Sequence, residues 1–191
     1  MVKTASFCRT ELLKATDLTL LSMEQEHIDH VLEIEKISFD LPWNSQMFKE
    51  EFVLSYSHHF VLYVENKLGG YICFHTVVDE LEILRIAVHP CFRRQGIGTH
   101  LMQICFQIAF DHDIDNLFLE TPCSNSQAIE FYQQLGFTVI GKRPNYYQSY
   151  TTINAQSIMA QDAVVMRNSL KKTKNMNKEI NHGKTNTTYC R

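Results

Sequence analysis

The chain has 191 residues, which suits one domain with extensions and is long enough to bury a substantial core. Hydrophobic residues make up 45% of it and charged residues 20%, as in ordinary globular proteins. A formal net charge of -3 gives no reason to expect nucleic-acid binding by bulk charge. No apolar run is long enough to span a bilayer.

The six cysteines show no Cys-x-x-Cys pair and no regular spacing. Cys73 and Cys105 fall inside apolar periodic segments, where a free cysteine behaves as a small hydrophobe. This usage favours a reducing compartment over a disulfide framework. Since the N-terminus also leads into no apolar signal-peptide core, we expect a cytoplasmic protein that does not associate with membranes.

The first half of the chain alternates between the periods of strands and helices. We expect, in order, a strand at 19–23, a helix through Val31, Ile34 and Ile37, a helix through Phe48 and Phe52, and strands at 60–65, 70–78 and 81–88. Ser45 is a plausible N-cap of the second helix. Residues 66–69 are predicted to form a hairpin turn, and His89-Pro90 ends the last of these strands.

The second half continues with a mixed pattern. We expect a helix at about 98–110, a strand at 117–120, a helix at about 126–135, and closing strands at 137–140 and 163–166. Ser124 and Gln127 have capping-box spacing for the second of these helices, and Gly136 suits its C-terminal cap. The pattern stops at Lys171. The predicted organisation is therefore an extension (1–17), one domain (18–170) and a basic, disordered tail (171–191).

Residues 93–98, Arg-Arg-Gln-Gly-Ile-Gly, lie between an apolar strand and the start of a helical pattern. Glycines permit unusual backbone dihedrals and a close approach, and the N-terminus of a helix carries partial positive charge. Together they form a cradle for an anion, so we expect a phosphorylated ligand at this turn.

Two nucleotide motifs fit this turn poorly. A P-loop requires Gly-Lys-Ser/Thr, but Thr99 and His100 follow Gly98. A dinucleotide fingerprint needs a third small residue where Leu101 stands, and begins directly at the end of the strand. Glu120 does lie near the expected position of the ribose-binding acid, so the dinucleotide interpretation stays as an alternative.

A third motif fits better. The end of the strand (Ile86-Ala87-Val88), His-Pro, and Arg/Gln-x-x-Gly-x-Gly resemble the pyrophosphate-binding motif of the GNAT family of N-acetyltransferases. The resemblance implies that acetyl-CoA is the cosubstrate. Main-chain groups of the strand end would bind its pantetheine arm as a pseudo-strand. The implied cofactor-binding residues are Ile86, Ala87, Val88, Arg93, Arg94, Gln95, Gly96, Ile97, Gly98, Thr99 and Asn125.

Further motifs narrow the resemblance. Segments 119–125 and 128–137, Asn145-Tyr146-Tyr147 and Leu41-Pro42-Trp43-Asn44-Ser45 are similar to bacterial ribosomal-protein-alanine N-acetyltransferases of this family. Over about 19–169 this implies an α+β fold with a mixed, mostly antiparallel central sheet flanked by helices. Acetyl-CoA would lie between the strands ending at Val88 and beginning near Leu117. The acceptor implied is the N-terminal alanine of the eighteenth small-subunit ribosomal protein, acetylated directly in a ternary complex.

Acetyl transfer needs a base for the amine and a proton for the departing thiolate. The resemblance implies that Glu120 is the base and Tyr132 the acid. From the residues alone, Glu120 could be a solvated carboxylate at a strand end and Tyr132 an aromatic of the core. Asn125 would contact the cofactor, or cap a helix. The amide of Val88 is the expected oxyanion donor. His27 with His30, and His58 with His59, lack a third ligand of clear spacing, so we expect no metal.

Some positions depart from the family's pattern. Pro122 replaces a common arginine, Gln148 replaces a proline, and the segment 149–161 is longer than the corresponding loop. These differences concern the acceptor more than the cofactor. Two alternatives therefore remain: acetylation of a lysine side chain or a small-molecule amine, and non-catalytic binding of an acyl-CoA.

Overall fold

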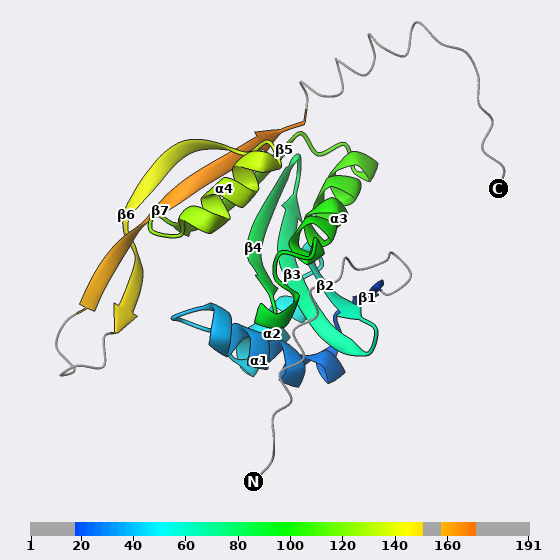
Figure 1. The fold of residues 1–191 in the computed structure, drawn as a ribbon. Coiled ribbons are helices and arrows are strands. Elements are labelled where there is room, and N and C mark those ends of the chain that lie inside the picture. The colour runs from blue at the N-terminus through cyan, green and yellow to red at the C-terminus, as the bar shows by residue number, and fades with distance from the viewer. Residues whose placement is uncertain (1–17, 151–157, 171–191) are drawn as a thin grey trace, which may run out of the picture.

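The computed structural model describes residues 18–150 and 158–170, so the expected extension (1–17) and tail (171–191) lie outside the described residues. The helices and strands are shown in Figure 1. In chain order they are β1 (Leu18–Ser22), η2 (Gln25–His27), α1 (Ile28–Ser38), α2 (Ser45–Phe52), β2 (Ser57–Val64), β3 (Lys67–Val77), β4 (Glu80–Val88), η3 (Pro90–Phe92), α3 (Ile97–Asp111), β5 (Asn116–Pro122), α4 (Ser126–Gln134), β6 (Thr138–Tyr150) and β7 (Ile158–Ser169).

Within the described ranges the strands form one seven-stranded sheet in the order β1-β2-β3-β4-β5-β7-β6. β4 and β5 run parallel, and the other neighbouring strands run antiparallel. The connection between the two parallel strands contains α3, as a crossover requires. The predicted α+β fold with a mixed, mostly antiparallel sheet is confirmed.

The middle of the sheet is buried on both faces. Successive residues of a strand point to opposite faces, and in β3 Tyr71 and Cys73 pack with α1 and α2, whereas Ile72 and Phe74 pack with α3. Because both sets are buried, the middle of β3 is a continuous apolar run. The helices thus divide into two layers, α1 and α2 on one face and α3 and α4 on the other.

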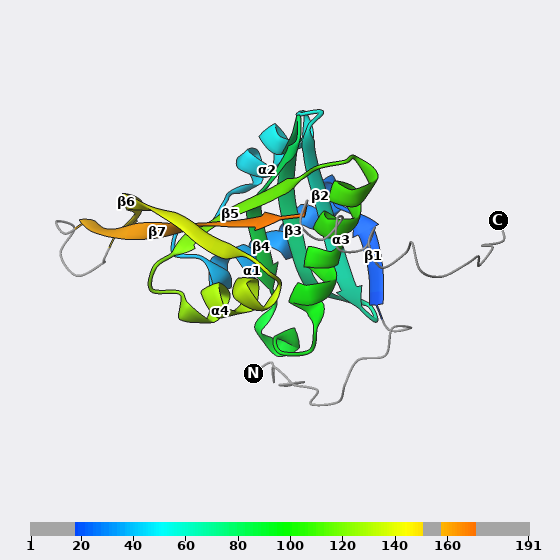
Figure 2. The same cartoon turned by 90° about the horizontal axis from the view of Figure 1, so that it is seen from above.

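The sheet opens between β4 and β5. Their pairing ends at Ile83 and Leu119, although both strands continue. At the same level β4 contains a bulge, because Cys73 pairs with Arg85 and Phe74 with Ile83, which leaves Leu84 as an extra residue. Beyond the bulge the two strands diverge, and β6 and β7 project to one side (Figures 1 and 2). The opening thus lies between the two predicted strands, β4, which ends at Val88, and β5, which begins at Asn116, and it starts after Leu119.

The two predicted N-caps were each wrong by one residue, whereas Gly136 follows Leu135, the C-cap of α4, with a φ of 89°, as predicted. Asn44, not Ser45, is the N-cap of α2, and its side chain accepts a hydrogen bond from the amide of Met47 at 3.0 Å. Asn125 caps α4 by accepting from the amide of Ala128 at 3.2 Å, so the predicted Ser124 capping box does not form. In both helices an asparagine adjoins the predicted serine, and spacing alone could not separate two good capping residues.

Two hairpins also differ from the prediction. The turn predicted at 66–69 is a two-residue turn at 65–66, because Val64 pairs with Lys67. The closing strands, predicted at 137–140 and 163–166, are the longer β6 and β7. Their outer parts lie beyond the helices and carry exposed polar residues, so they lack the apolar alternation of a strand over a core. The long loop expected at 149–161 consequently begins and ends as strand.

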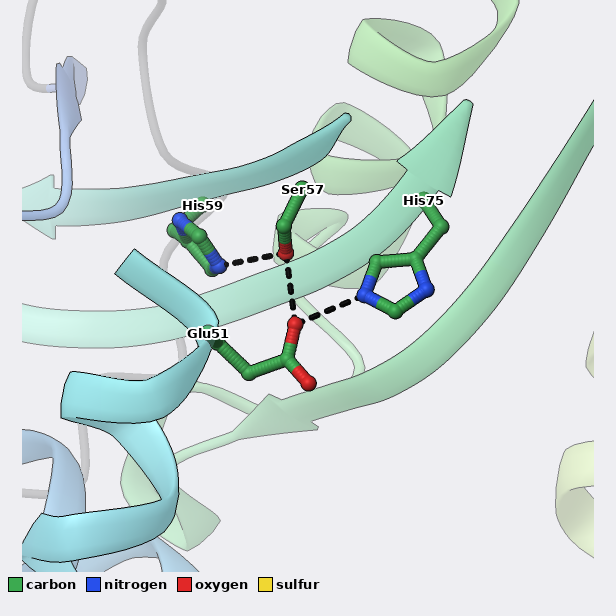
Figure 3. A network of polar contacts seen from close by, with 4 residues as sticks. All are labelled: Glu51, Ser57, His59 and His75. Atoms are coloured by element: carbon green, nitrogen blue, oxygen red, sulfur yellow. Dashed lines mark hydrogen bonds and ion pairs between the residues drawn. The ribbon is translucent and has the colours of Figure 1, made fainter. Parts of the chain in front are cut away.

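The C-terminal end of α2 is fixed to the sheet by a polar network (Figure 3). The hydroxyl of Ser57 donates to Oε2 of Glu51 at 2.7 Å, and Nε2 of His75 lies 2.6 Å from the same oxygen. Nε2 of His59 lies 2.8 Å from the hydroxyl of Ser57. Burial lowers the pKa of His59 to about 4, so this histidine is neutral at neutral pH.

Candidate active site

The N-terminus of α3 presents free backbone amides. Gly96 caps the helix with a φ of 85°, a left-handed conformation that favours glycine, and no side chain caps the helix. The first amides of a helix, here those of Ile97, Gly98 and Thr99, have no acceptor within the helix. An anion of the size of a phosphate can therefore accept hydrogen bonds from them, which fits the pyrophosphate of acetyl-CoA.

The two arginines of the turn differ in their surroundings. Nε of Arg93 donates to the carbonyl of Val88 at 3.1 Å, and its NH2 group lies 3.5 Å from the hydroxyl of Ser38. Arg93 therefore fixes the end of β4. Arg94 is exposed and has a φ of 62°. Among the described residues, the side chain of Arg94 makes no hydrogen bond to the protein like those of Arg93, and it faces solvent.

Gln95 and Gly98, both predicted to bind the cofactor, also have structural roles. The amide nitrogen Nε2 of Gln95 donates to the carbonyl of Cys91 at 2.8 Å, while its Oε1 is buried without a hydrogen-bond partner. A Cβ atom added to Gly98 would lie 3.2 Å from Cζ of Phe131. Glycine at this position thus allows α3 and α4 to pack closely beside the anion cradle.

The free edge of β4 presents main-chain groups to the opening. The amide of His89 donates to the carbonyl of Gly69 at 2.9 Å. Hydrogen-bonded and non-hydrogen-bonded pairs alternate along an antiparallel ladder, so Ala87 bonds to β3, whereas Ile86 and Val88 point their N–H and C=O groups away from β3. Of the three residues predicted to bind pantetheine, two therefore have main-chain groups facing the opening.

Glu120 lies on β5 one residue beyond the last pair with β4. Its Oε1 accepts from Nε of Arg143 at 2.8 Å, and its side chain is only 12% exposed. Within residues 18–150 and 158–170 its Oε2 is buried and has no hydrogen-bond partner, while the phenol of Tyr146 interacts with the same carboxylate. The two oxygens therefore differ in their surroundings.

Tyr146 and Tyr147 of β6 lie beside this carboxylate. Their rings are 5.1 Å apart, and the guanidinium of Arg143 lies 5.5 Å from the ring of Tyr146. Burial, aided by Tyr146 and Glu120, raises the pKa of Tyr147 to about 12. The structure thus brings both tyrosines to Glu120. Arg143 was missed by sequence reasoning, because it lies in a segment without an apolar pattern.

Tyr132 lies on α4, on the opposite face of the sheet from Glu120. It is buried in the core, with its ring 5.9 Å from that of Phe137. Burial raises its pKa well above the ordinary value, so its hydroxyl stays protonated at neutral pH. Tyr147 adds to the rise in the pKa of Tyr132, and Glu120 adds to the rise in the pKa of Tyr147. Tyr147 therefore interacts with both predicted catalytic residues.

Of the four histidines considered above as metal ligands, His27, His58 and His59 contact protein groups. Nδ1 of His27 accepts from the amide of Glu24 at 2.9 Å, and Nε2 of His58 lies 2.8 Å from the hydroxyl of Thr76. Over residues 18–150 and 158–170, no group of three or more His, Cys, Asp or Glu side chains could hold a metal ion. Nor does any described helix have the length and apolar character needed to cross a membrane.

Residues 28–137 match the model of the acetyltransferase (GNAT) family. The chain belongs to this family. The Escherichia coli (strain K12) ribosomal protein bS18-alanine N-acetyltransferase is 30% identical over 129 residues, which cover 68% of this chain and 86% of that enzyme. A Bacillus subtilis (strain 168) protein provisionally given the same activity is 35% identical over 133 residues, or 69% of this chain and 88% of its own.

Comparison with solved structures identifies the same group of acetyltransferases. The crystal structure of the Escherichia coli ribosomal-protein-S18-alanine N-acetyltransferase superposes with a TM-score of 0.69 at 28% identity, covering 80% of this chain and 93% of that one. The protein is an acetyl-CoA-dependent N-acetyltransferase. The dinucleotide interpretation of the glycine turn is thereby excluded.

Proposed function

We propose that this acetyltransferase modifies the N-terminal alanine of the ribosomal protein bS18, within a ternary complex and in the cytoplasm. The acceptor is supported by the names of relatives 30–35% identical to the chain. One observation above all supports the catalytic role of Glu120. Among the described residues, its Oε2 is buried without a hydrogen-bond partner, at the level where β4 and β5 separate. The domain responsible would span residues 18–170.

Glu120 would act as the general base. An α-amino group has a pKa near about 8, so most of it is protonated at neutral pH and must lose a proton before it attacks. Arg143 holds one oxygen of Glu120, which leaves Oε2 to accept that proton directly or through a water. The ion pair also keeps Glu120 oriented while the acceptor enters.

The other residues would bind acetyl-CoA and complete the proton transfers. Acetyl-CoA supplies the acetyl group on a thioester. The first amides of α3 would hold its pyrophosphate, and Ile86 and Val88 would hydrogen-bond its pantetheine arm. The amide of Val88 would stabilise the oxygen that becomes negative, and the hydroxyl of Tyr132 would give its proton to the departing sulfur.

An α-amine is favoured over a lysine side chain for a chemical reason as well. A lysine has a pKa near about 10.4, so it demands more of a base than an α-amine does. A general base therefore has less to do when the acceptor is an α-amine than when it is a lysine side chain.

The test compares two synthetic peptides with the sequence of the bS18 N-terminus. One starts with a free alanine amine, and the other has that amine blocked and retains a lysine. We expect the purified protein to acetylate the first and not the second, as measured by mass spectrometry and by release of coenzyme A. Faster acetylation of the blocked peptide would assign the protein to lysine instead.

A second comparison tests the base. We expect Glu120→Gln to lower kcat by about 10²- to 10⁴-fold and to leave acetyl-CoA affinity within about twofold. Glu33→Gln, which changes an exposed carboxylate on α1, serves as the control and should match the wild type. Full turnover by the Glu120 variant would contradict the mechanism.

A further inference from the structure

Arg85 is the residue of β4 that follows the bulge at Leu84. Its guanidinium carbon lies 4.3 Å from the centre of the Phe39 ring and 5.1 Å from that of Trp43. Its NH2 group also donates to the carbonyl of Leu41 at 3.0 Å. One side chain thus contacts three residues of the segment 39–44 that joins α1 to α2, which we call the acceptor loop.

A second contact, from the buried carboxylate of Glu35 on α1, also fixes the acceptor loop. Oε2 of Glu35 accepts from the amide of Trp43 at 2.7 Å, and its Oε1 accepts from the hydroxyl of Tyr71. Nε of Arg85 lies 3.9 Å from that Oε1, and the Glu35 side chain is 0% exposed. Burial raises the pKa of Glu35, so the contacts of its oxygens, rather than a full charge pair, fix the loop.

Arg85 is also close enough to β6 for its charge to act on Tyr147, where it opposes the rise in pKa that burial causes. The guanidinium that contacts the acceptor loop therefore also influences a residue beside Glu120. Leu41 and Tyr146 leave apolar surface exposed at 46% and 50%, on the loop and on β6 respectively. This surface is available to a peptide chain that reaches Glu120.

We propose that Arg85 is a specificity-determining positioning residue, which holds the acceptor loop against the bulge of β4 so that the loop and β6 bind the acceptor peptide together. The inference rests on the proposed function in one respect, that the acceptor is a peptide with a free amine. The planar guanidinium suits the role because it stacks on aromatic rings and donates hydrogen bonds in fixed directions.

The experiment uses Trp43 as a reporter, since it is the only tryptophan of the chain. Quenching of its fluorescence by acrylamide is measured in the full-length wild type, in Arg85→Met and in Arg85→Lys, without any substrate. We expect the quenching constant to rise in Arg85→Met, because the loop is released, and to lie between the two in Arg85→Lys. The lysine variant keeps the charge and is the milder change if the methionine variant does not fold.

Kinetics supply the second measurement. We expect the acceptor kcat/KM of Arg85→Met to fall by about ten- to a hundredfold, mainly through KM, while the KM of acetyl-CoA stays within about twofold. A loss shared equally by the two substrates would overturn the proposal. So would unchanged quenching together with an unchanged acceptor KM.

The network at the other end of α2 provides a matched control. His75→Gln removes the contact between β3 and Glu51 and loosens α2 without touching the acceptor loop. We expect it to lower the melting temperature but to leave Trp43 quenching and the acceptor KM unchanged. If it changes both as Arg85→Met does, the effect of Arg85 is general destabilisation.

If the wild type acetylates no peptide, the proposed function fails, and the quenching result still decides the role of Arg85 in the loop.

Discussion

At the scale of single residues, the proposed catalytic role of Glu120 depends on the different surroundings of its two oxygens. Arg143 binds Oε1, and among the described residues Oε2 is buried without a hydrogen-bond partner. The type of residue at position 120 could be predicted from a motif, because a base is needed near the cofactor. The inequality of its oxygens could not, because it depends on a side chain that is 23 positions away in the sequence.

Tyr132→Phe tests the proposed acid. The change keeps the ring that packs against Phe137 and removes only the hydroxyl, so we expect a loss of stability below about 1.5 kcal/mol. We expect kcat to fall by about a hundredfold, since the departing sulfur loses its proton donor. Steady-state kinetics and thermal unfolding measure the two effects. A variant with wild-type kcat would show that Tyr132 is a core residue only.

At the scale of elements, the proposed cofactor site lies where a strand ends and a helix begins. β4 ends at Val88 with main-chain groups directed away from β3, and α3 begins at Ile97 with uncapped amides. The sequence predicts this junction well, because glycine placement and apolar periodicity are local signals. The bulge at Leu84 carries no such signal, since a bulge is defined by the register with a neighbouring strand.

Gly96→Ala tests the start of α3. The φ of 85° places an alanine in a strained conformation, at a cost of about 1 kcal/mol, and relief of that strain would move the first amides of the helix. We expect the KM of acetyl-CoA to rise several-fold and the KM of the acceptor to change little. Gly141→Ala on β6 is the control, because a Cβ atom there meets nothing within 4 Å. Equal behaviour of the two variants would argue against an anion site at α3.

At the scale of the whole molecule, two helical layers cover a sheet that parts in the middle. α1 and α2 carry the acceptor loop on one face, and α4 carries Tyr132 on the other. The network of Glu51, Ser57, His59 and His75 in Figure 3 fixes α2 to β2 and β3. The stability of this layer therefore depends on the protonation of a partly buried histidine.

We expect the protein to lose stability in mild acid. The pKa of His59 falls from 6.5 to about 4 in the folded state, mainly through burial, with His58 and His75 adding to the decrease and Glu51 opposing it. Between these values the unfolded chain binds the proton first, so stability is complete above about pH 6.5 and declines as the pH falls towards 4. Thermal unfolding at several pH values measures this. His59→Gln should flatten the decline, and an undiminished decline in that variant would assign it to other groups.

Local sequence patterns were enough to predict the order of the elements, the family and the glycine turn that we propose to bind an anion. These rest on local chemistry: periodicity, glycine placement and motifs of adjacent residues. The errors of prediction, at the caps beside Asn44 and Asn125 and in the lengths of β6 and β7, arise where adjacent residues are equally suitable or where a strand extends past the core.

Contacts between segments distant in the sequence could be read from the three-dimensional fold alone. It set the level at which β4 and β5 separate, the pairing of Glu120 with Arg143, and the contact of Arg85 with the acceptor loop. It also determined that Ile86 and Val88, but not Ala87, turn main-chain groups towards the opening. Strand register and contacts between distant segments set these features, because they minimise free energy over the whole chain rather than within any one segment.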